Sequence, residues 1–362
     1  MAESRSGRAS EHAMSILDDL QRSPTPYHAV EHAQRLLAAA GFSSAAPDER
    51  FPTEAGGRYV VNGGTLIAWW QPDPQRAGNK AAPFRVVGAH TDSPNLRVRT
   101  SPDVTAAGFE QVGMEIYGGV LLNSWLDRDL GLAGRVTVDA GSGQLETMLF
   151  CDDDPLLRIP QLAIHLDREI REKGLKLDPQ RHLTPLWALS RASEGSGSDD
   201  LDGGEDPHDA GAVRRHVAEG LGIDAGAIRS WDLMAFDTQP PAVVGRDGDM
   251  FASARIDNLV SAFCAIRALT SATAASSSGD GADLPYLPVV VLYDHEEIGS
   301  ESATGAAGAL LGSTLERIAG AAGLDRQDYL AALAASLVVS ADGAHATHPN
   351  YVDKHEPSHH IA

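Results

Sequence analysis

Residues 287–307 read LPVVVLYDHEEIGSESATGAA, and this stretch decides the fold. It starts with a short apolar run rich in β-branched side chains, which predicts a strand buried on both faces of a mainly parallel sheet. The run stops at Asp294, His295, Glu296 and Glu297. Ligands of open α/β sheets bind beyond the carboxyl ends of the strands, so the position of these polar residues favours a site. The alternative is an acidic turn that only meets water, and the rest of the chain has to decide.

The adjacent pair Glu296 and Glu297 suits metal-assisted hydrolysis. Two neighbouring glutamates cannot both face a core. If they leave the strand in a loop, one can coordinate a metal while the other handles the proton of a metal-bound water.

The composition is that of an ordinary globular protein with a large negative charge. The 362 residues suit about two domains, and 43% are hydrophobic. The net charge of −21 argues against nucleic acid or an anionic membrane as a partner, because a polyanion would be repelled. Two cysteines are too few for a disulfide framework, and no apolar run reaches the ~20 residues of a membrane span. Without the apolar core of a signal peptide at the N-terminus, we expect a cytoplasmic protein.

The first hundred residues have α/β texture. Residues 10–22 and 26–40 have apolar side chains at helical spacing and predict two helices. Residues 84–88 predict a strand, which runs directly into His90 and Asp92. As at residue 294, side chains that bind metals follow an apolar strand.

The middle of the chain has short predicted strands and many turns, which indicates an inserted β-rich second domain. A helix is predicted at 162–172. Residues 194–209 contain seven acidic residues and no Lys or Arg, and they predict a mobile surface loop because they cannot bury enough apolar surface. The predicted boundaries are a catalytic domain made of residues 1–98 and 240–362, interrupted by residues 99–239.

The α/β texture resumes after Pro240. An amphipathic helix is predicted at 256–272, with Asp257 in its first turn. Residues 336–340 (SLVVS) predict the last buried strand, which ends just before Asp342. A His or carboxylate therefore stands at the end of a strand or the start of a helix in four separate segments, and four such coincidences are strong evidence for a site.

This constellation predicts a pair of divalent metal ions. Two metals about 3.5–4 Å apart need a bridging carboxylate, terminal ligands for each ion and a base for the shared water. Imidazole with carboxylates fits zinc, with cobalt or manganese as possible replacements. Asp92 stands two residues beyond His90 and is better placed to orient the histidine than to reach a metal itself.

The chain resembles the aspartyl aminopeptidases, a family of dinuclear zinc metallo-aminopeptidases that form tetrahedral dodecamers. The matching motifs are HTDSP (90–94), NSWLDRDLGLAGRV (123–136), RIPQLAIHLDR (158–168), ARIDNL (254–259), EEIGSESATGA (296–306) and SADGAHATHPNYVDKHEP (340–357). They extend over nearly the whole chain.

The resemblance implies a phosphorylase/hydrolase-like metallopeptidase sheet with helices on both faces, interrupted by a β-rich dimerisation domain. It implies removal of N-terminal residues, preferentially Asp or Glu, from peptides, two Zn²⁺ per subunit, and homodimers that assemble into a dodecamer. It also implies these roles: Asp257 bridges the two ions, His90 and Asp342 complete one, Glu297 binds the other, Glu296 is the general base, Asp92 orients His90, and His165 (from the partner subunit) and His348 contact substrate.

Similar proteins continue beyond the equivalent of Ala362, and their tail supplies a last histidine ligand and a basic residue that recognises substrate. We therefore expect this chain to lack the family's C-terminal segment. Two alternatives follow from the residues: another dinuclear amidohydrolase, such as a deacylase of N-acyl molecules, because the metal chemistry would be the same, or a non-catalytic assembly subunit with an incomplete site.

Overall fold

The computed structural model describes residues 11–71, 82–190, 211–274 and 284–358. The predicted acidic loop 194–209 lies outside the described residues. The chain divides into two units. Unit 1 comprises residues 1–22, 29–92 and 243–362, and unit 2 comprises residues 23–28 and 93–242.

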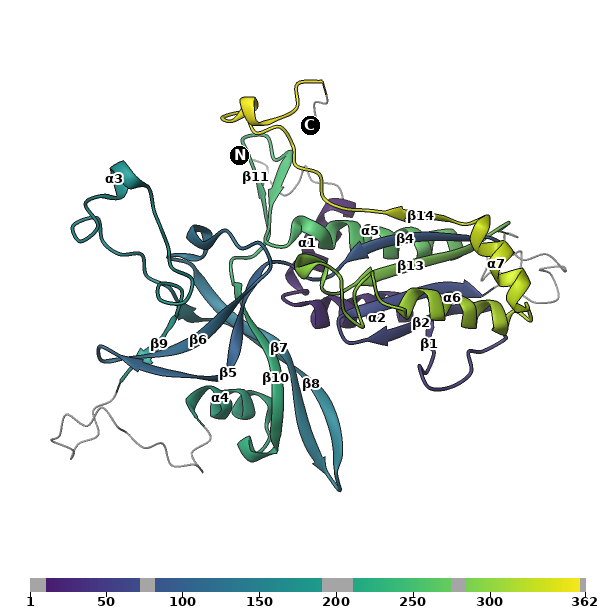
Figure 1. Ribbon diagram of the computed structural model, residues 1–362, viewed down its shortest axis with the longest axis horizontal. Coiled ribbons are helices and arrows are strands. Elements are labelled where there is room, and N and C mark those ends of the chain that lie inside the picture. The colour runs from purple at the N-terminus through teal and green to yellow at the C-terminus, as the bar shows by residue number, and fades with distance from the viewer. Residues whose placement is uncertain (1–10, 72–81, 191–210, 275–283, 359–362) are drawn as a thin grey trace, which may run out of the picture. The chain divides into compact units, whose positions relative to one another are not determined.

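Unit 1 is an α/β unit built on one mixed β-sheet (Figure 1). Within the described residues its strand order is β1-β2-β3-β13-β4-β14. Strands β13, β4 and β14 run parallel, whereas β13 pairs antiparallel with β3, so the sheet is less parallel than the sequence predicts. The strands are β1 (Ser43–Ser44), β2 (Gly56–Asn62), β3 (Thr65–Gln71), β4 (Phe84–His90), β13 (Leu287–Tyr293) and β14 (Leu337–Ser340).

Helices cover both faces of this sheet, which explains why β13 is apolar along its length. Val290 and Leu292 belong to the core under α1, α2 and α5, whereas Val289 and Val291 belong to the core under α6 and α7. Alternate side chains of a strand point to opposite faces, so both sets are buried. The helices are α1 (Glu11–Gln21), α2 (Pro26–Ala39), α5 (Ile256–Ala274), α6 (Leu310–Ala321) and α7 (Arg326–Ala334).

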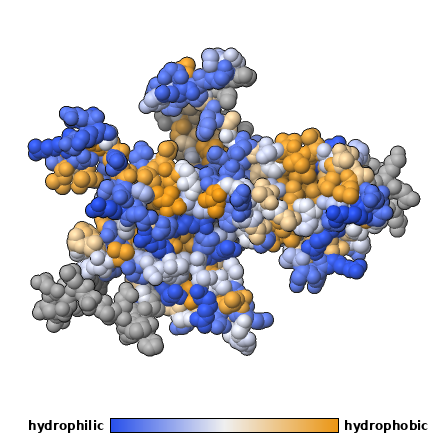
Figure 2. Space-filling model, in the orientation of Figure 1, coloured by the Kyte–Doolittle hydropathy of each residue, from blue (hydrophilic) through white to orange (hydrophobic). Residues whose placement is uncertain are grey.

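Strand β14 corrects one prediction. We expected residues 336–340 to be buried, but Leu337 and Val338 are 55% and 58% exposed, because β14 is the edge strand of the described sheet and pairs only with β4 there. Figure 2 shows the hydrophobic surface over this strand. Strands β11 (Ala242–Val244) and β12 (Met250–Ala252) pair with each other and form a separate two-stranded sheet.

Unit 2 is built on a closed antiparallel barrel with the strand order β10-β5-β6-β9-β8-β7. Alternate barrel residues such as Leu130, Leu132 and Val136 point inward and form its core, against which α4 packs through Val213 and Val217. The elements are β5 (Asn95–Ala106), β6 (Phe109–Tyr117), β7 (Asp129–Gly141), β8 (Gln144–Arg158), α3 (Ile170–Lys173), β9 (Leu186–Leu189), α4 (Ala212–Leu221) and β10 (Ile228–Asp237).

The predicted helix at 162–172 is wrong over most of its length, because only α3 forms. Leu162, Ile164 and Leu166 are exposed. Most helical stability in proteins comes from packing an apolar face, and these side chains have no core to pack against within the described unit.

Candidate metal centre

The parallel register of unit 1 brings three chain segments to one edge of the sheet. Tyr293 at the end of β13 lies opposite His90 at the end of β4, and Ser340 of β14 lies opposite Gly88. The residues that follow these strands therefore meet at the carboxyl edge. The start of α5 joins them, because the Asn258 side-chain amide donates a hydrogen bond to the Ala341 carbonyl oxygen at 2.8 Å. The Asp257–Asn258 peptide bond is cis.

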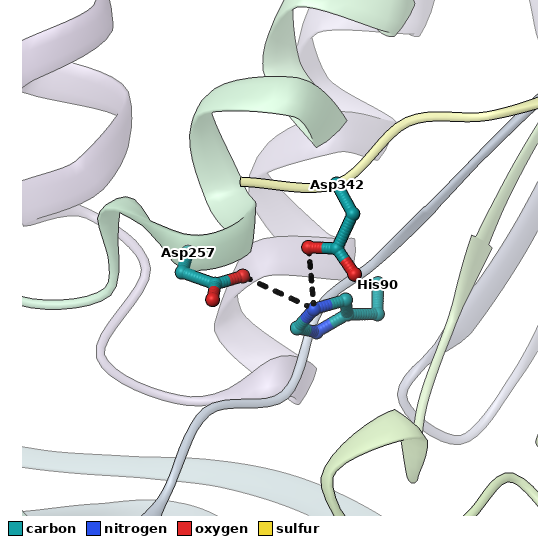
Figure 3. Close-up of side chains that lie close together, drawn as sticks. All are labelled: His90, Asp257 and Asp342. Carbon is teal, nitrogen blue, oxygen red and sulfur yellow. Dashed lines mark ion pairs between the residues drawn. The ribbon is translucent and has the colours of Figure 1, made fainter. Parts of the chain in front are cut away.

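His90 is the buried centre of the resulting cluster (Figure 3). Its Nε2 atom lies 3.3 Å from Asp257 Oδ1, 3.6 Å from Asp342 Oδ1 and 3.9 Å from Glu296 Oε2. The side chains of these three acids are about half exposed, so they form the solvent side of the cluster.

Two overlapping groups in the described residues have the spacing of metal ligands. The first is His90 with Asp257 and Asp342, and the second is His90 with Glu296 and Glu297. In each group the ligand atoms lie within 4.8 Å of one another. The second group differs from the ligand set implied by the resemblance. In that set, the ion bound by Glu297 is also bound by Asp257, which bridges the two ions.

Asp92 is fully buried and makes more contacts than the sequence suggests. His90 Nδ1 lies 3.0 Å from the Asp92 backbone carbonyl oxygen and 3.4 Å from its carboxylate. The two carboxylate oxygens accept hydrogen bonds from the backbone amides of Glu296 and Glu297, each at 3.1 Å. Asp92 therefore fixes the imidazole and the turn that carries the glutamates at the same time.

Negative charge dominates the electrostatics of the cluster. Burial opposes protonation of His90, but the hydrogen bond and charge of Asp92, with Glu296, outweigh it and raise the pKa of His90 to about 9. Burial, together with the surrounding carboxylates, raises the pKa of Glu297 to about 7. Burial and the charge of Asp342 also raise the pKa of Asp257. A cation among these carboxylates would offset the part of the Glu297 and Asp257 shifts that comes from neighbouring carboxylates.

A cavity of about 310 Å³ opens beside the cluster. His90, Glu296 and Asp342 line it, together with Tyr293 and several small residues. Glu296 is thus the member of the glutamate pair that faces the cavity.

The two histidines that were predicted to bind substrate are both exposed. His348 is exposed in the segment after β14, where its ring packs edge-on against Tyr351 and its backbone amide donates to His355 Nε2 at 2.9 Å. His165 is exposed in unit 2, between β8 and α3. Neither belongs to the two ligand groups of the described residues.

The profile of the family described as aminopeptidase I zinc metalloprotease (M18) matches residues 20–362. The chain belongs to the M18 family. Its members are zinc metallo-aminopeptidases, so the enzyme class and the resemblance predicted from sequence are confirmed at the level of the family.

Curated M18 relatives share much of this sequence. A probable M18 family aminopeptidase 2 of Streptomyces avermitilis is 47% identical over 349 residues, which are 96% of this chain and 74% of the relative. A protein with the same description from Mycobacterium tuberculosis is 40% identical over 353 residues, 96% of this chain and 75% of the relative. This M18 chain thus spans about three quarters of their length.

Solved structures agree with the M18 fold. The complex of Ape4 and Nbr1 superposes with a TM-score of 0.84 at 32% identity and covers 96% of this chain and 66% of that chain. The mApe1 dodecamer of S. cerevisiae superposes with a TM-score of 0.77 at 25% identity, covering 97% of this chain and 75% of that chain.

Among the described residues of the M18 chain, no helix is both long and apolar enough to cross a membrane.

Proposed function

We propose that this M18 chain removes N-terminal residues from peptides, with a preference for Asp or Glu, using a site that holds two zinc ions. The family supplies the reaction class. The acidic preference rests on the resemblance of the motifs to aspartyl aminopeptidases. The observation that carries the proposal is the cluster of one imidazole and four carboxylates beside a cavity, in a chain of a zinc aminopeptidase family.

The donor set fits zinc. Zinc takes imidazole nitrogen and carboxylate oxygen. Burial and neighbouring carboxylates raise the pKa values of Glu297 and Asp257, and a bound cation would favour the charged form of both groups. His90, Asp257 and Asp342 would hold one ion, and Glu297 with the shared Asp257 would contribute to the other. Bound divalent ions supply Lewis acidity, which acidifies water and polarises the scissile carbonyl group.

Glu296 is the general base in this proposal. Its carboxylate is half exposed and lines the cavity, where it can take a proton from the attacking water and return it to the leaving amine nitrogen. Asp92 supports this task because it holds the backbone amide of Glu296 and therefore fixes where the carboxylate starts.

The test is a substrate panel with the zinc-loaded protein. Peptides that begin with Asp, Glu, Leu or Lys are compared with the same peptides acetylated at the N-terminus and with N-acyl amino acids. We expect release of free Asp or Glu and no reaction with blocked peptides. Preferential hydrolysis of the N-acyl amino acids would replace the proposal with a deacylase, and equal rates on Leu and Asp peptides would remove the acidic preference only.

We also propose that the chain assembles as homodimers in a dodecamer, with unit 2 as the dimerisation domain. The support is that the mApe1 protein of S. cerevisiae is described as a dodecamer. In such a dimer His165 would reach the substrate bound by the partner subunit, and His348 would contact substrate within its own subunit. Native mass spectrometry checks the assembly, because a dodecamer has the mass of twelve chains of 38.2 kDa.

A further inference from the structure

The turn that carries Glu296 and Glu297 has an unusual backbone. His295 immediately before it lies in the left-handed region (φ 67°, ψ 23°), and Gly299 and Ser300 after it also have positive φ. Left-handed backbone is uncommon for residues other than glycine and needs local support. The Ser300 backbone amide donates to the His295 carbonyl oxygen at 2.8 Å and closes the turn.

The His295 imidazole provides such support from the side chain. Its Nδ1 atom lies 2.8 Å from Ser302 Oγ and 3.1 Å from Thr304 Oγ1. The side chain is 24% exposed, so most of the ring is enclosed. Ser302 Oγ also accepts a hydrogen bond from the Gly305 backbone amide at 3.0 Å, which fixes the hydroxyl.

Further hydrogen bonds connect this loop to Asp294, the residue that follows β13, and complete a closed network. The Thr65 hydroxyl donates to the Thr304 carbonyl oxygen at 2.7 Å and accepts from the Asp294 backbone amide at 2.8 Å. Asp294 Oδ1 accepts from the His295 backbone amide at 2.9 Å. Thr65 and Asp294 are both buried, so this hydrogen-bond network is anchored in the core of unit 1.

We propose that His295 is a positioning residue: its imidazole joins the segment 302–304 to the left-handed start of the turn and so presents Glu296 and Glu297 to the metal centre. Asp92 holds the amides of both glutamates from one side, and His295 fixes the entry of the turn from the other. This inference rests on the proposed metal function and deepens it.

The experiment measures zinc affinity by competition with a chelator, and the visible absorption of bound Co²⁺, on the full chain. His295→Phe keeps ring volume but removes both hydrogen-bonding nitrogens. Loss of residues that orient metal ligands typically costs roughly 10–100-fold in metal affinity or activity, and we expect a fall of that size with a changed Co²⁺ spectrum. His295→Asn should lose less, because Asn tolerates left-handed backbone and keeps a polar side chain.

The matched control is His32→Phe. His32 is a buried histidine of the same unit, and its Nε2 lies 2.8 Å from the buried Asp19 carboxylate, apart from the metal cluster. This control should lower the melting temperature while zinc affinity and the Co²⁺ spectrum stay at wild-type values. Equal losses of zinc affinity in His32→Phe and His295→Phe would overturn the inference, as would wild-type zinc affinity in His295→Phe.

If His295→Phe does not fold, the double variant Ser302→Ala, Thr304→Val is used instead. It removes the two hydroxyl groups that contact the imidazole and leaves His295 in place. It should also bind zinc more weakly, and wild-type affinity there would contradict the positioning role. Absence of zinc binding by the wild-type chain would instead overturn the proposed metal function and this inference with it, so the two failures are distinguishable.

Discussion

At the scale of single residues, the adjacent acids Glu296 and Glu297 have different surroundings. Glu296 faces the cavity, whereas Glu297 is more enclosed and has a pKa raised to about 7 by burial and by neighbouring carboxylates. Because a ligand and a proton carrier need different environments, this difference supports giving the two residues different tasks.

We expect Glu296→Gln to lower kcat by roughly 10²–10⁴-fold with unchanged zinc content, because an amide keeps the shape but cannot take a proton. Glu297→Gln should lower zinc content, since an amide is a poorer ligand. Steady-state kinetics on an Asp-peptide and elemental analysis measure both. Glu301→Gln, an exposed glutamate of the same loop, is the control and should change neither. Unchanged zinc in Glu297→Gln would contradict its assignment.

Asp92 gives a second prediction at this scale. Both of its carboxylate oxygens accept from backbone amides, so Asp92→Asn must turn an NH₂ group towards an N–H donor. Leaving a buried donor unsatisfied costs about 1–3 kcal/mol, and we expect the free energy of unfolding to fall by that amount, with a loss of activity.

Denaturant unfolding measures the effect of Asp92→Asn. The control is Asp103→Asn, because Asp103 is exposed and accepts from the Val213 amide through one oxygen, which an amide oxygen can replace. Equal stability of the Asp92→Asn and wild-type proteins would show that the two amides are satisfied in another way.

At the scale of elements, the strands that carry the site could be predicted because their sequences contain the whole reason for their burial. The β-branched run of β13 has apolar residues for both faces of the sheet, and the polar residues stand where it ends. His90 and Asp342 could therefore be predicted to meet, since parallel strands end at one edge. Asp257 stands at the start of a helix, and its place beside them was implied by the resemblance. Their roles in catalysis stay a prediction.

Other features depend on partners that local sequence does not name. The apolar run of β14 predicts burial, but its position at the edge of the described sheet decides exposure. The His295 network was not predicted, although the histidine stands directly before the glutamates, because its partners lie seven and nine residues later in an irregular loop. No periodic pattern marks such contacts.

The exposed apolar edge of β14 is expected to promote aggregation. Leu337 pairs with Arg85 of β4, so Leu337→Glu places a carboxylate opposite a guanidinium group and adds charge to the edge. We expect less aggregate by light scattering and a melting temperature close to that of the wild type. Leu145→Glu, which changes a 64% exposed leucine of the barrel, is the control. An equal decrease in aggregate for Leu145→Glu would show that the effect comes from net charge alone.

At the scale of the whole molecule, the proposed dimer makes a prediction about His165. If His165 serves the partner's site, mixing inactive Glu296→Gln subunits with inactive His165→Ala subunits should restore activity, because each mixed dimer then has one complete site. Peptidase assays after subunit exchange measure the rescue. Glu296→Gln mixed with Glu297→Gln should stay inactive, since no subunit then has an intact centre. Absence of rescue in exchanged dimers would place the function of His165 within its own subunit.

The order of segments along the chain also has a consequence for biosynthesis. The metal cluster draws on His90 before the insertion and on residues up to Asp342 after it, while the barrel of unit 2 is complete once residue 242 has been made. At about 5–20 residues per second, the ribosome needs on the order of 10–50 s to travel from Asp92 to Asp342. The barrel can fold during that interval, whereas β4 must wait for its neighbours β13 and β14, and its face under α6 and α7 stays uncovered until those helices are made. The nascent chain should therefore depend on chaperones at this stage.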